Sequence, residues 1–279
     1  MYCFHPMDRP VRIPRIGVMG TPNIIAPDFE RKADLAPPWL SPKFWFSIIP
    51  WPVVAPIALF LLTVAAFLPA IMADYVYWDD DDLLINTIIY RTLDRDSLHW
   101  MFSTSYAGHF QPLTWLSYWL DWTLWKREVS GFHLTSVLLH AGTALIFYFF
   151  VKRLVFLSFR TNQTGDPLST SIHSPALCLA SALAAALFAV HPLRVESVAW
   201  LAERRDVLSG FFFVASIASY VRWRTREVGQ ATTRGWYWLA LLFQLLSLLA
   251  KASAVSLPFV LLILDVFPLR RLESLPWKK

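Results

Sequence analysis

The sequence predicts an all-α protein, a polytopic transmembrane helical bundle with about six spans. Of its 279 residues, 56% are hydrophobic and only 16% are charged, which is more apolar than is usual for a soluble domain. The apolar residues also gather into runs that approach the roughly 20 residues a helix needs to cross a hydrocarbon core. Lipid is therefore the expected solvent of most of the chain.

Six apolar runs are the candidate spans. They are residues 52–73, 134–157, 176–190, 207–221, 236–250 and 253–267. The first two are long enough to cross a bilayer alone, whereas the other four are short and have to pack together or extend into the interfaces. The first run is preceded by a polar, proline-rich segment and is too long for a signal peptide, so it is expected to act as an uncleaved anchor.

Three segments make up the predicted domain organisation. Residues 1–50 are rich in Pro and Arg without apolar periodicity and are expected to form a disordered cytoplasmic tail. Residues 51–271 are expected to form the transmembrane domain, and residues 272–279 a cytoplasmic C-terminal tail. Cys3 and Cys178 fall at different depths in this arrangement, so no disulfide or zinc site is expected.

The distribution of positive charge predicts the orientation. The net charge is +5, and Lys and Arg collect in the N-terminal tail, in alternate connections and at the C-terminus. This pattern is typical of membrane topology, in which basic loops stay in the cytoplasm, and it argues against nucleic acid as a partner. We expect a cytoplasmic N-terminus in a bacterial plasma membrane or the endoplasmic reticulum. The segments expected outside are 74–132, 191–206 and the turn at Lys251.

The first external segment contains four adjacent carboxylates, Asp79 to Asp82. Like charges this close together raise the pKa of some members of the group. A carboxylate with a raised pKa is a candidate general base, or a ligand for a divalent cation, which the sequence permits but does not require. The alternative is a solvated N-terminal cap for the helix after it.

An amphipathic helix is predicted at 113–125 in the same segment. Its tryptophans share one face, at Trp115, Trp119, Trp122 and Trp125. We interpret them as anchors in the membrane interface, with a sugar-binding platform as the alternative. The opposite stripe, which includes Asp121, would then face a cleft beneath the segment. His133 and His140 lie seven residues apart, so they share a helix face, and they are expected to make interhelical hydrogen bonds.

The second external segment, 191–206, is dense in polar side chains. Arg can hold a phosphate with a bidentate fork, and His can donate a proton or hydrogen bond to it. The alternative is interfacial ion pairing that terminates the helices. Lys251, in the third segment, is expected to snorkel to the interface or to contact a lipid phosphate. The candidate substrate-binding residues of the second segment are His191, Arg194, Glu196, Arg204 and Arg205.

Several motifs in matching order resemble one family. They are Trp78-Asp79-Asp80, Gln111-Pro112-Leu113-Thr114, Gly131-Phe132-His133-Leu134-Thr135, His191-Pro192-Leu193-Arg194-Val195-Glu196 and Glu203-Arg204-Arg205-Asp206. Over roughly residues 52–271 the chain resembles the transmembrane and tetratricopeptide-repeat-containing O-mannosyltransferase-like proteins. No period of about 34 residues, typical of a tetratricopeptide array, is visible. The chain therefore resembles a truncated member that lacks the repeat array.

The resemblance implies the N-terminal half of a C-type membrane glycosyltransferase domain. Such an enzyme transfers a sugar, here expected to be mannose, from a polyprenyl or dolichyl phosphate to Ser or Thr hydroxyls of an acceptor polypeptide on the external face. Its general base would be Asp79 or Asp80, with inversion at the sugar carbon. The alternative is a truncated, non-catalytic membrane scaffold. The resemblance places contacts with the donor phosphate and sugar at His191, Arg194 and Glu196, with Arg204 and Arg205 as further candidates.

Overall fold

The structure is a computed structural model that describes residues 48–161, 171–225 and 233–271. The chain divides into two compact units after Ile48, and the helical group belongs to the second unit, Ile49–Lys279. Most of the predicted N-terminal tail, Cys3 and the C-terminal tail lie outside the described residues. Those described are helical, with one isolated bridge between Tyr106 and His109 and no strand. The all-α prediction is therefore confirmed for this part of the chain.

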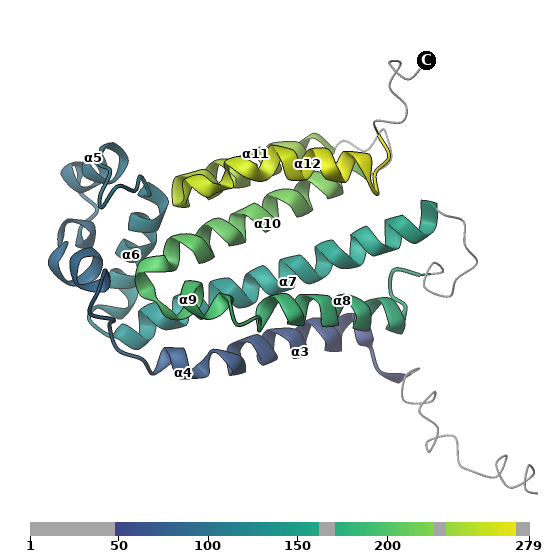
Figure 1. Cartoon of the computed structure of the whole chain (residues 1–279), viewed down its shortest axis with the longest axis horizontal. Helices are drawn as coiled ribbons and strands as arrows, with labels where there is room; N and C mark the ends of the chain where they lie inside the picture. The colour runs from purple at the N-terminus through teal and green to yellow at the C-terminus, as the bar shows by residue number, and fades with distance from the viewer. Residues whose placement is uncertain (1–47, 162–170, 226–232, 272–279) are drawn as a thin grey trace, which may run out of the picture. The chain divides into compact units, whose positions relative to one another are not determined.

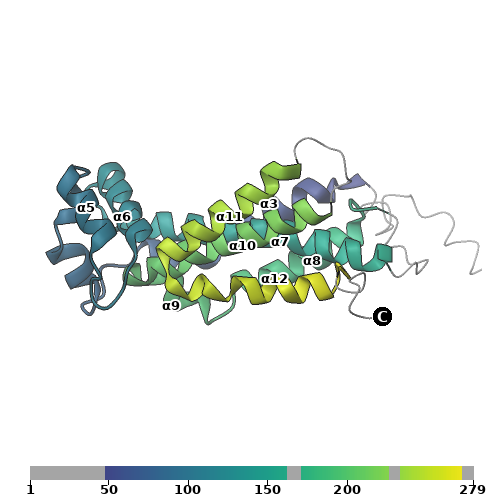
Figure 2. The ribbon, with the colours of Figure 1, turned by 90° about the horizontal axis from the view of Figure 1, so that it is seen from above.

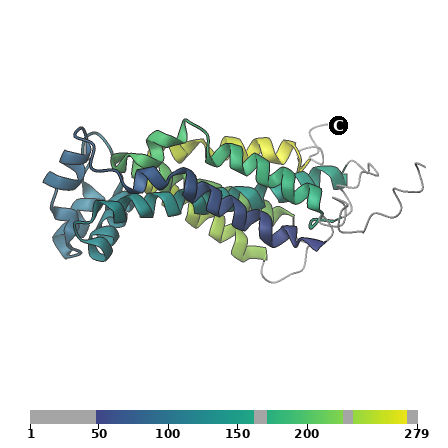
Figure 3. The ribbon, with the colours of Figure 1, turned by 90° about the horizontal axis from the view of Figure 1, so that it is seen from below.

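Six helices correspond to the six apolar runs. They are α3 (Trp51–Ala66), α7 (Val129–Thr161), α8 (Pro175–Ala189), α10 (Arg204–Arg224), α11 (Thr233–Ala250) and α12 (Leu257–Val266). Helix α7 is central, with α3, α8 and α10 packed against it, and α11 packs against α10 (Figures 1 and 2). Figure 3 shows α3, in purple, running along this group from the other side.

Two of the predicted runs are divided by short interruptions. The run 52–73 forms α3 and then α4 (Leu68–Ile71), with Pro69 in the first turn of α4. The run 253–267 begins as a 3₁₀ turn over Ala252–Ser256, and Pro258 lies in the first turn of α12. Proline lacks the backbone N–H that a helix interior needs, so it is favoured where a new helix begins.

Among the described residues, one helix is long and apolar enough to cross a membrane by length and composition, namely α7 over Val129–Phe159. The other apolar helical segments are shorter, namely α3, α8, Arg234–Ala250 of α11, and Ala252–Val266. Within α7, the His140 imidazole Nε2 lies 2.8 Å from the Ala189 carbonyl at the end of α8, which is the interhelical hydrogen bond expected from the sequence. Six spans remain a prediction.

The remaining helices, α5 (Arg95–Ser103), α6 (Pro112–Trp125) and α9 (Arg194–Ala199), lie at one end of the helical group (Figure 1). The turn at Lys251 reaches the same end, because the Thr114 hydroxyl of α6 donates to the Ala250 carbonyl at 3.3 Å. The three segments predicted to be external are therefore gathered together. The parts of α7 and α10 that carry Arg153 and Arg222 lie toward the opposite end (Figure 1). Which end faces the cytoplasm stays a prediction.

A core of aromatic side chains holds this end together. Trp115 is completely buried and contacts the rings of Trp100 and Tyr106. The Tyr118 hydroxyl donates to the Leu201 carbonyl at 2.7 Å, which joins α6 to the second external segment. The other three tryptophans of α6 are partly buried against the same core. The interpretation of this stripe as a membrane anchor is therefore wrong for Trp115, because the chain before α6 folds over it.

Candidate functional site

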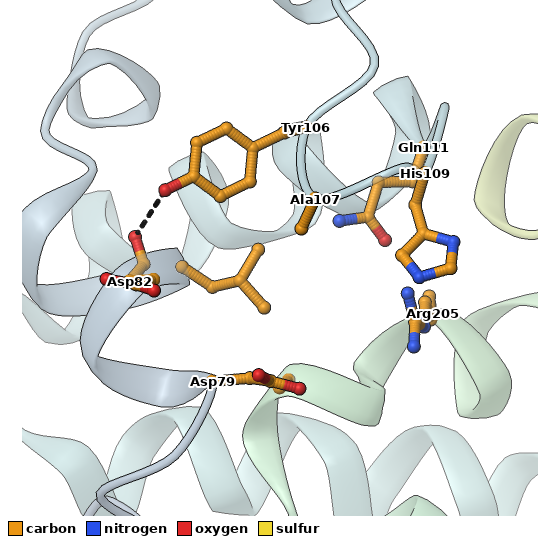
Figure 4. A pocket seen from close by; sticks show the side chains of 9 residues that line it. Asp79, Asp82, Tyr106, Ala107, His109, Gln111 and Arg205 are labelled. Carbon is orange, nitrogen blue, oxygen red and sulfur yellow. Dashed lines mark hydrogen bonds between the residues drawn. The ribbon is translucent and has the colours of Figure 1, made fainter.

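A cavity of about 390 Å³ lies among the gathered external segments (Figure 4). Most of its wall comes from the first external segment, and the rest from the second, at the start of α10. Two stretches that are far apart in the sequence therefore form one site. The lining residues are Asp79, Asp82, Leu83, Tyr106, Ala107, His109, Gln111, Ala202 and Arg205.

A tight turn carries three of these residues, Tyr106, Ala107 and His109. The backbone N–H of Tyr106 donates to the His109 carbonyl at 3.1 Å, and the N–H of His109 donates back at 2.9 Å. Between them, Ala107 and Gly108 have φ angles of 48° and 77°, as in the two-residue turns that need positive φ at both central positions. The Tyr106 hydroxyl donates to the Asp82 carbonyl at 3.2 Å, which fixes the turn against the acidic segment (Figure 4).

The adjacent carboxylates Asp79 and Asp80 have different environments. Asp80 is completely buried, and its two oxygens accept hydrogen bonds from the backbone N–H groups of Ala202, at 2.8 Å, and Val76, at 3.0 Å. Burial raises the pKa of Asp80, although the two backbone hydrogen bonds oppose this shift. Asp79 is half-buried and lines the cavity. Asp80 therefore ties the two external segments together, while Asp79 is available to a ligand.

Arg205 gives the cavity its positive charge. Its guanidinium is ion-paired with Glu203 and lies next to the ring of His109 (Figure 4). His109 is exposed where it lines the cavity. Partial desolvation, followed by the charge of Arg205, lowers its pKa and favours the neutral imidazole. Burial alone would raise the pKa of Glu203, but Arg205 and Lys251 lower it below its usual value. Glu203 is therefore held as a carboxylate.

Lys251 belongs to the same charged group. Its ammonium is 3.4 Å from a Glu203 oxygen and is also ion-paired with Asp206. Its charge is thus paired with two carboxylates of the second external segment, while the expected snorkelling to the interface or contact with a lipid phosphate stays a prediction. This pairing brings the third external turn to the cavity region.

Gln111 contributes an acceptor that has no hydrogen-bond partner among the described residues. The side chain is 2% exposed, lines the cavity, and its carboxamide oxygen has no hydrogen bond. A buried acceptor left in this state costs about 1–3 kcal/mol. A hydroxyl group of a bound molecule would satisfy it. The cavity thus offers a carboxylate, a guanidinium, an imidazole and a carboxamide. The described residues contain no group of three or more His, Cys, Asp or Glu that could hold a metal ion.

Arg204, although next to Arg205, points into the protein. Its Nη1 is 2.6 Å from a carboxylate oxygen of Asp121, its Nε donates to the Ser136 hydroxyl at 2.7 Å, and its Nη2 donates to the Phe132 carbonyl at 2.5 Å. The side chains of Arg204 and Asp121 are both completely buried. Neither lines the cavity, so the predicted substrate contact of Arg204 and the predicted cleft-facing role of Asp121 are replaced by an internal ion pair.

Three further predicted site residues lie away from this cavity. His191 is exposed, and its Nδ1 accepts a hydrogen bond from the Leu193 N–H at 3.3 Å. Arg194 packs over Phe188, with its guanidinium carbon 4.5 Å from the ring centroid. Glu196 is exposed on α9. The cavity therefore brings together Asp79 and Arg205 from the predicted set, whereas Asp80 is buried and does not line it.

Tyr106, His109 and Gln111 are residues that sequence reasoning did not assign to a site. Gln111 was visible as the first residue of the Gln-Pro-Leu-Thr motif, immediately before α6. Nothing in the spacing of Tyr106 and His109 indicated that a turn would place them opposite the second external segment.

Comparison with known proteins places the chain near one group of enzymes. Protein O-mannosyl-transferase TMTC2 of Mus musculus is 28% identical over 221 residues, which is 76% of this chain and 24% of that protein. Protein O-mannosyl-transferase Tmtc3 of Drosophila melanogaster is 28% identical over 178 residues, 60% of this chain and 18% of the other. TMTC4 of Homo sapiens is 25% identical over 253 residues, 86% of this chain and 32% of the other.

The chain thus spans a third or less of the length of these relatives. No family model matches the sequence, and no solved structure matches it. The similarity nevertheless recurs in several relatives and covers most of this chain, which confirms the resemblance found from the motifs. The chain is similar to the TMTC protein O-mannosyl-transferases.

Proposed function

We propose that the chain is a membrane glycosyltransferase that transfers mannose from a polyprenyl or dolichyl phosphate to a Ser or Thr hydroxyl of a polypeptide. The names of the relatives support protein O-mannosyl transfer. The observation that carries the proposal is that Asp79 and Arg205 line one cavity of about 390 Å³. A carboxylate and a guanidinium are the groups needed to accept a proton from the acceptor and to hold a phosphate leaving group.

In the proposed reaction, the acceptor hydroxyl oxygen attacks the anomeric carbon of the sugar. Its proton passes to the Asp79 carboxylate, the bond between the anomeric carbon and the phosphate oxygen breaks, and the lipid phosphate leaves. Attack from the face opposite the leaving group inverts the configuration at the anomeric carbon. Arg205 stabilises the charge that grows on the phosphate, and His109 donates a hydrogen bond to the same group.

Two other residues have supporting roles. The free carboxamide oxygen of Gln111 accepts a hydrogen bond from a sugar hydroxyl, which selects and orients the donor. Asp80 keeps Asp79 in place by joining the acidic segment to Ala202. It is a positioning residue, because both of its oxygens already accept backbone hydrogen bonds. Of the two aspartates, we therefore assign the general base to Asp79.

The proposed topology rests on the charge distribution. The chain crosses a bacterial plasma membrane or the endoplasmic reticulum membrane several times, with a cytoplasmic N-terminus, and the cavity opens on the external face. The lipid tail of the donor would lie among the apolar helices. Residues 51–271 would be the N-terminal half of a C-type glycosyltransferase domain.

The test is sugar transfer in proteoliposomes, from radiolabelled polyprenyl-phosphate mannose to a Ser/Thr-rich peptide. Wild type is expected to transfer, and Arg205→Gln is expected to lower kcat/KM by about tenfold to a hundredfold, the equivalent of losing a hydrogen bond to a charged group. Arg127→Gln, which removes an exposed charge in the connection between α6 and α7, is the matched control. No transfer by folded wild type, with several lipid-phosphate sugars tried, would favour the non-catalytic scaffold.

A further inference from the structure

A second cavity, of about 280 Å³, lies between α7, α10 and α11, toward the end of the helical group that is opposite the candidate site. Its wall is mainly aromatic and aliphatic, with Phe150 from α7, Phe211 from α10 and Phe243 from α11. No residue of the candidate site lines it. Aromatic and aliphatic walls of this kind accommodate a hydrocarbon chain.

Two arginines from different helices line the same cavity. The Arg153 guanidinium of α7 donates to the Thr225 hydroxyl, at 3.0 Å from Nε and 2.6 Å from Nη2, so it is held close to the end of α10. The Arg222 guanidinium carbon lies 4.5 Å from the centroid of the Trp236 ring, at the start of α11. These contacts place both cations near the end of α10 and the start of α11, with the apolar wall extending from them along the three helices.

An apolar cavity with two guanidiniums at one end fits a molecule that has a hydrocarbon chain and an anionic head. A guanidinium forms bidentate hydrogen bonds with a phosphate. In the proposed topology this end of the helices faces the cytoplasm, and the cytoplasmic leaflet is rich in anionic lipids that attract juxtamembrane Lys and Arg. Charge complementarity therefore favours a phospholipid with net negative charge over a neutral lipid.

We propose that this cavity binds an anionic phospholipid, with its phosphate at Arg153 and Arg222 and part of one acyl chain beside Phe150, Phe211 and Phe243. The inference rests on the membrane topology given under the proposed function, and it concerns a lipid distinct from the sugar donor. The bound lipid joins α7, α10 and α11 at the end where their connections carry positive charge.

The experiment is native mass spectrometry of the full chain in detergent, with dioleoyl phosphatidylglycerol or dioleoyl phosphatidylcholine added. Wild type is expected to retain one phosphatidylglycerol at concentrations where phosphatidylcholine is lost. The Arg153→Gln, Arg222→Gln double variant is expected to need at least about fivefold more phosphatidylglycerol for the same occupancy, given the interaction of each basic residue with anionic lipid.

Two further variants separate the cavity from its surroundings. The control is the Arg224→Gln, Arg270→Gln double variant, which removes two positive charges at the same end from residues that do not line the cavity. It is expected to retain phosphatidylglycerol as wild type does. Ala218→Phe narrows the cavity without changing the charge and is expected to reduce retention. Circular dichroism in phosphatidylcholine confirms that each variant is folded, and Ala218→Phe tests the site even if the arginine variants unfold.

Equal retention of the two lipids by wild type would overturn the inference, as would unchanged retention in both Ala218→Phe and the cavity arginine variant. The inference would also be overturned if inorganic phosphate raised the unfolding temperature of wild type as much as phosphatidylglycerol does. An anion without a hydrocarbon chain would then be enough to occupy the site. Lipid retention is measured without sugar transfer, so failure here is distinguishable from failure of the proposed enzyme activity.

Discussion

Arg204 and Asp121 form an ion pair at 2.6 Å in which both side chains are completely shielded from solvent. The second oxygen of Asp121 accepts a hydrogen bond from the Thr135 hydroxyl at 2.7 Å. The pair therefore joins α6, α7 and α10 at the end of the protein that holds the cavity. Because Arg205 comes directly after Arg204 in α10, this internal contact also determines which way Arg205 faces.

Arg204→Met is expected to lower the free energy of unfolding by about 3–5 kcal/mol, because it leaves the Asp121 carboxylate buried without its counter-charge. The double variant Arg204→Met, Asp121→Leu is expected to recover most of that loss, since no buried charge then remains. Denaturant unfolding in detergent, monitored by tryptophan fluorescence, measures both. An Arg204→Met variant as stable as the exposed-site control Arg127→Met would contradict the role given to the pair.

Substitution of Asp80 is expected to lower the free energy of unfolding more than substitution of Asp79. Asp80→Asn loses a backbone hydrogen bond, because its amide group cannot accept from an N–H, and it should cost about 1–3 kcal/mol. Asp79→Asn should change stability by no more than about 0.5 kcal/mol, since its side chain lines the cavity. Unfolding of the two variants under identical conditions gives the comparison, and equal losses would refute the division of roles.

The pKa of His109 is expected to rise in Arg205→Gln, because the substitution removes a neighbouring positive charge that lowers it. The contribution of His109 to stability depends on pH. A histidine with a lowered pKa in the folded state binds fewer protons than in the unfolded state, so its contribution is present above the ordinary histidine pKa and is lost as the pH falls below it. Arg205→Gln should make that loss smaller.

The measurement is an NMR titration of histidine-labelled protein, with the His109 signal assigned by its absence in His109→Gln. Arg127→Gln again serves as the control, since it removes an exposed positive charge from a residue that does not line the cavity. A His109 titration that does not move between wild type and Arg205→Gln would show that the two side chains are not electrostatically coupled.

Orientation is tested by labelling single cysteines in a Cys3→Ser, Cys178→Ala background. Ser103, at the end of α5, and Ser171, shortly before α8 begins at Pro175, are both exposed and are each replaced by Cys. An impermeant maleimide is expected to label position 103 from outside and position 171 only after permeabilisation, because the basic connections are predicted to be cytoplasmic. The opposite pattern would reverse the topology.

The apolar runs predicted the helices well, but their ends depend on contacts that periodicity does not record. Helix α7 begins at Val129, before the predicted run at 134, because its first turn packs within the protein through Phe132. Gly131 in that turn permits close approach of Trp125, whose side-chain atoms lie 2.3 to 2.6 Å from where a Cβ would be. Such a contact becomes visible only once α6 and α7 are placed together.

Only part of the site could be predicted from the sequence, because the rest again depends on contacts between distant residues. Motifs indicated the acidic segment and the Arg-Arg pair, and both contribute to the cavity. Which member of each pair faces the cavity depends on partners far away in the chain: Asp121 for Arg204, and Ala202 for Asp80. His109 enters the site through a turn stabilised by its own backbone, and no helical or strand pattern predicts that placement.

The most direct test of the central proposal is single-turnover transfer of labelled mannose with the lipid donor already bound, comparing wild type, Asp79→Asn and the exposed first-segment control Asp96→Asn. A general base contributes about 10²- to 10⁴-fold, so Asp79→Asn is predicted to slow transfer by that factor while donor binding and the Asp96→Asn rate stay at wild-type values. Transfer by Asp79→Asn at the wild-type rate would contradict the account.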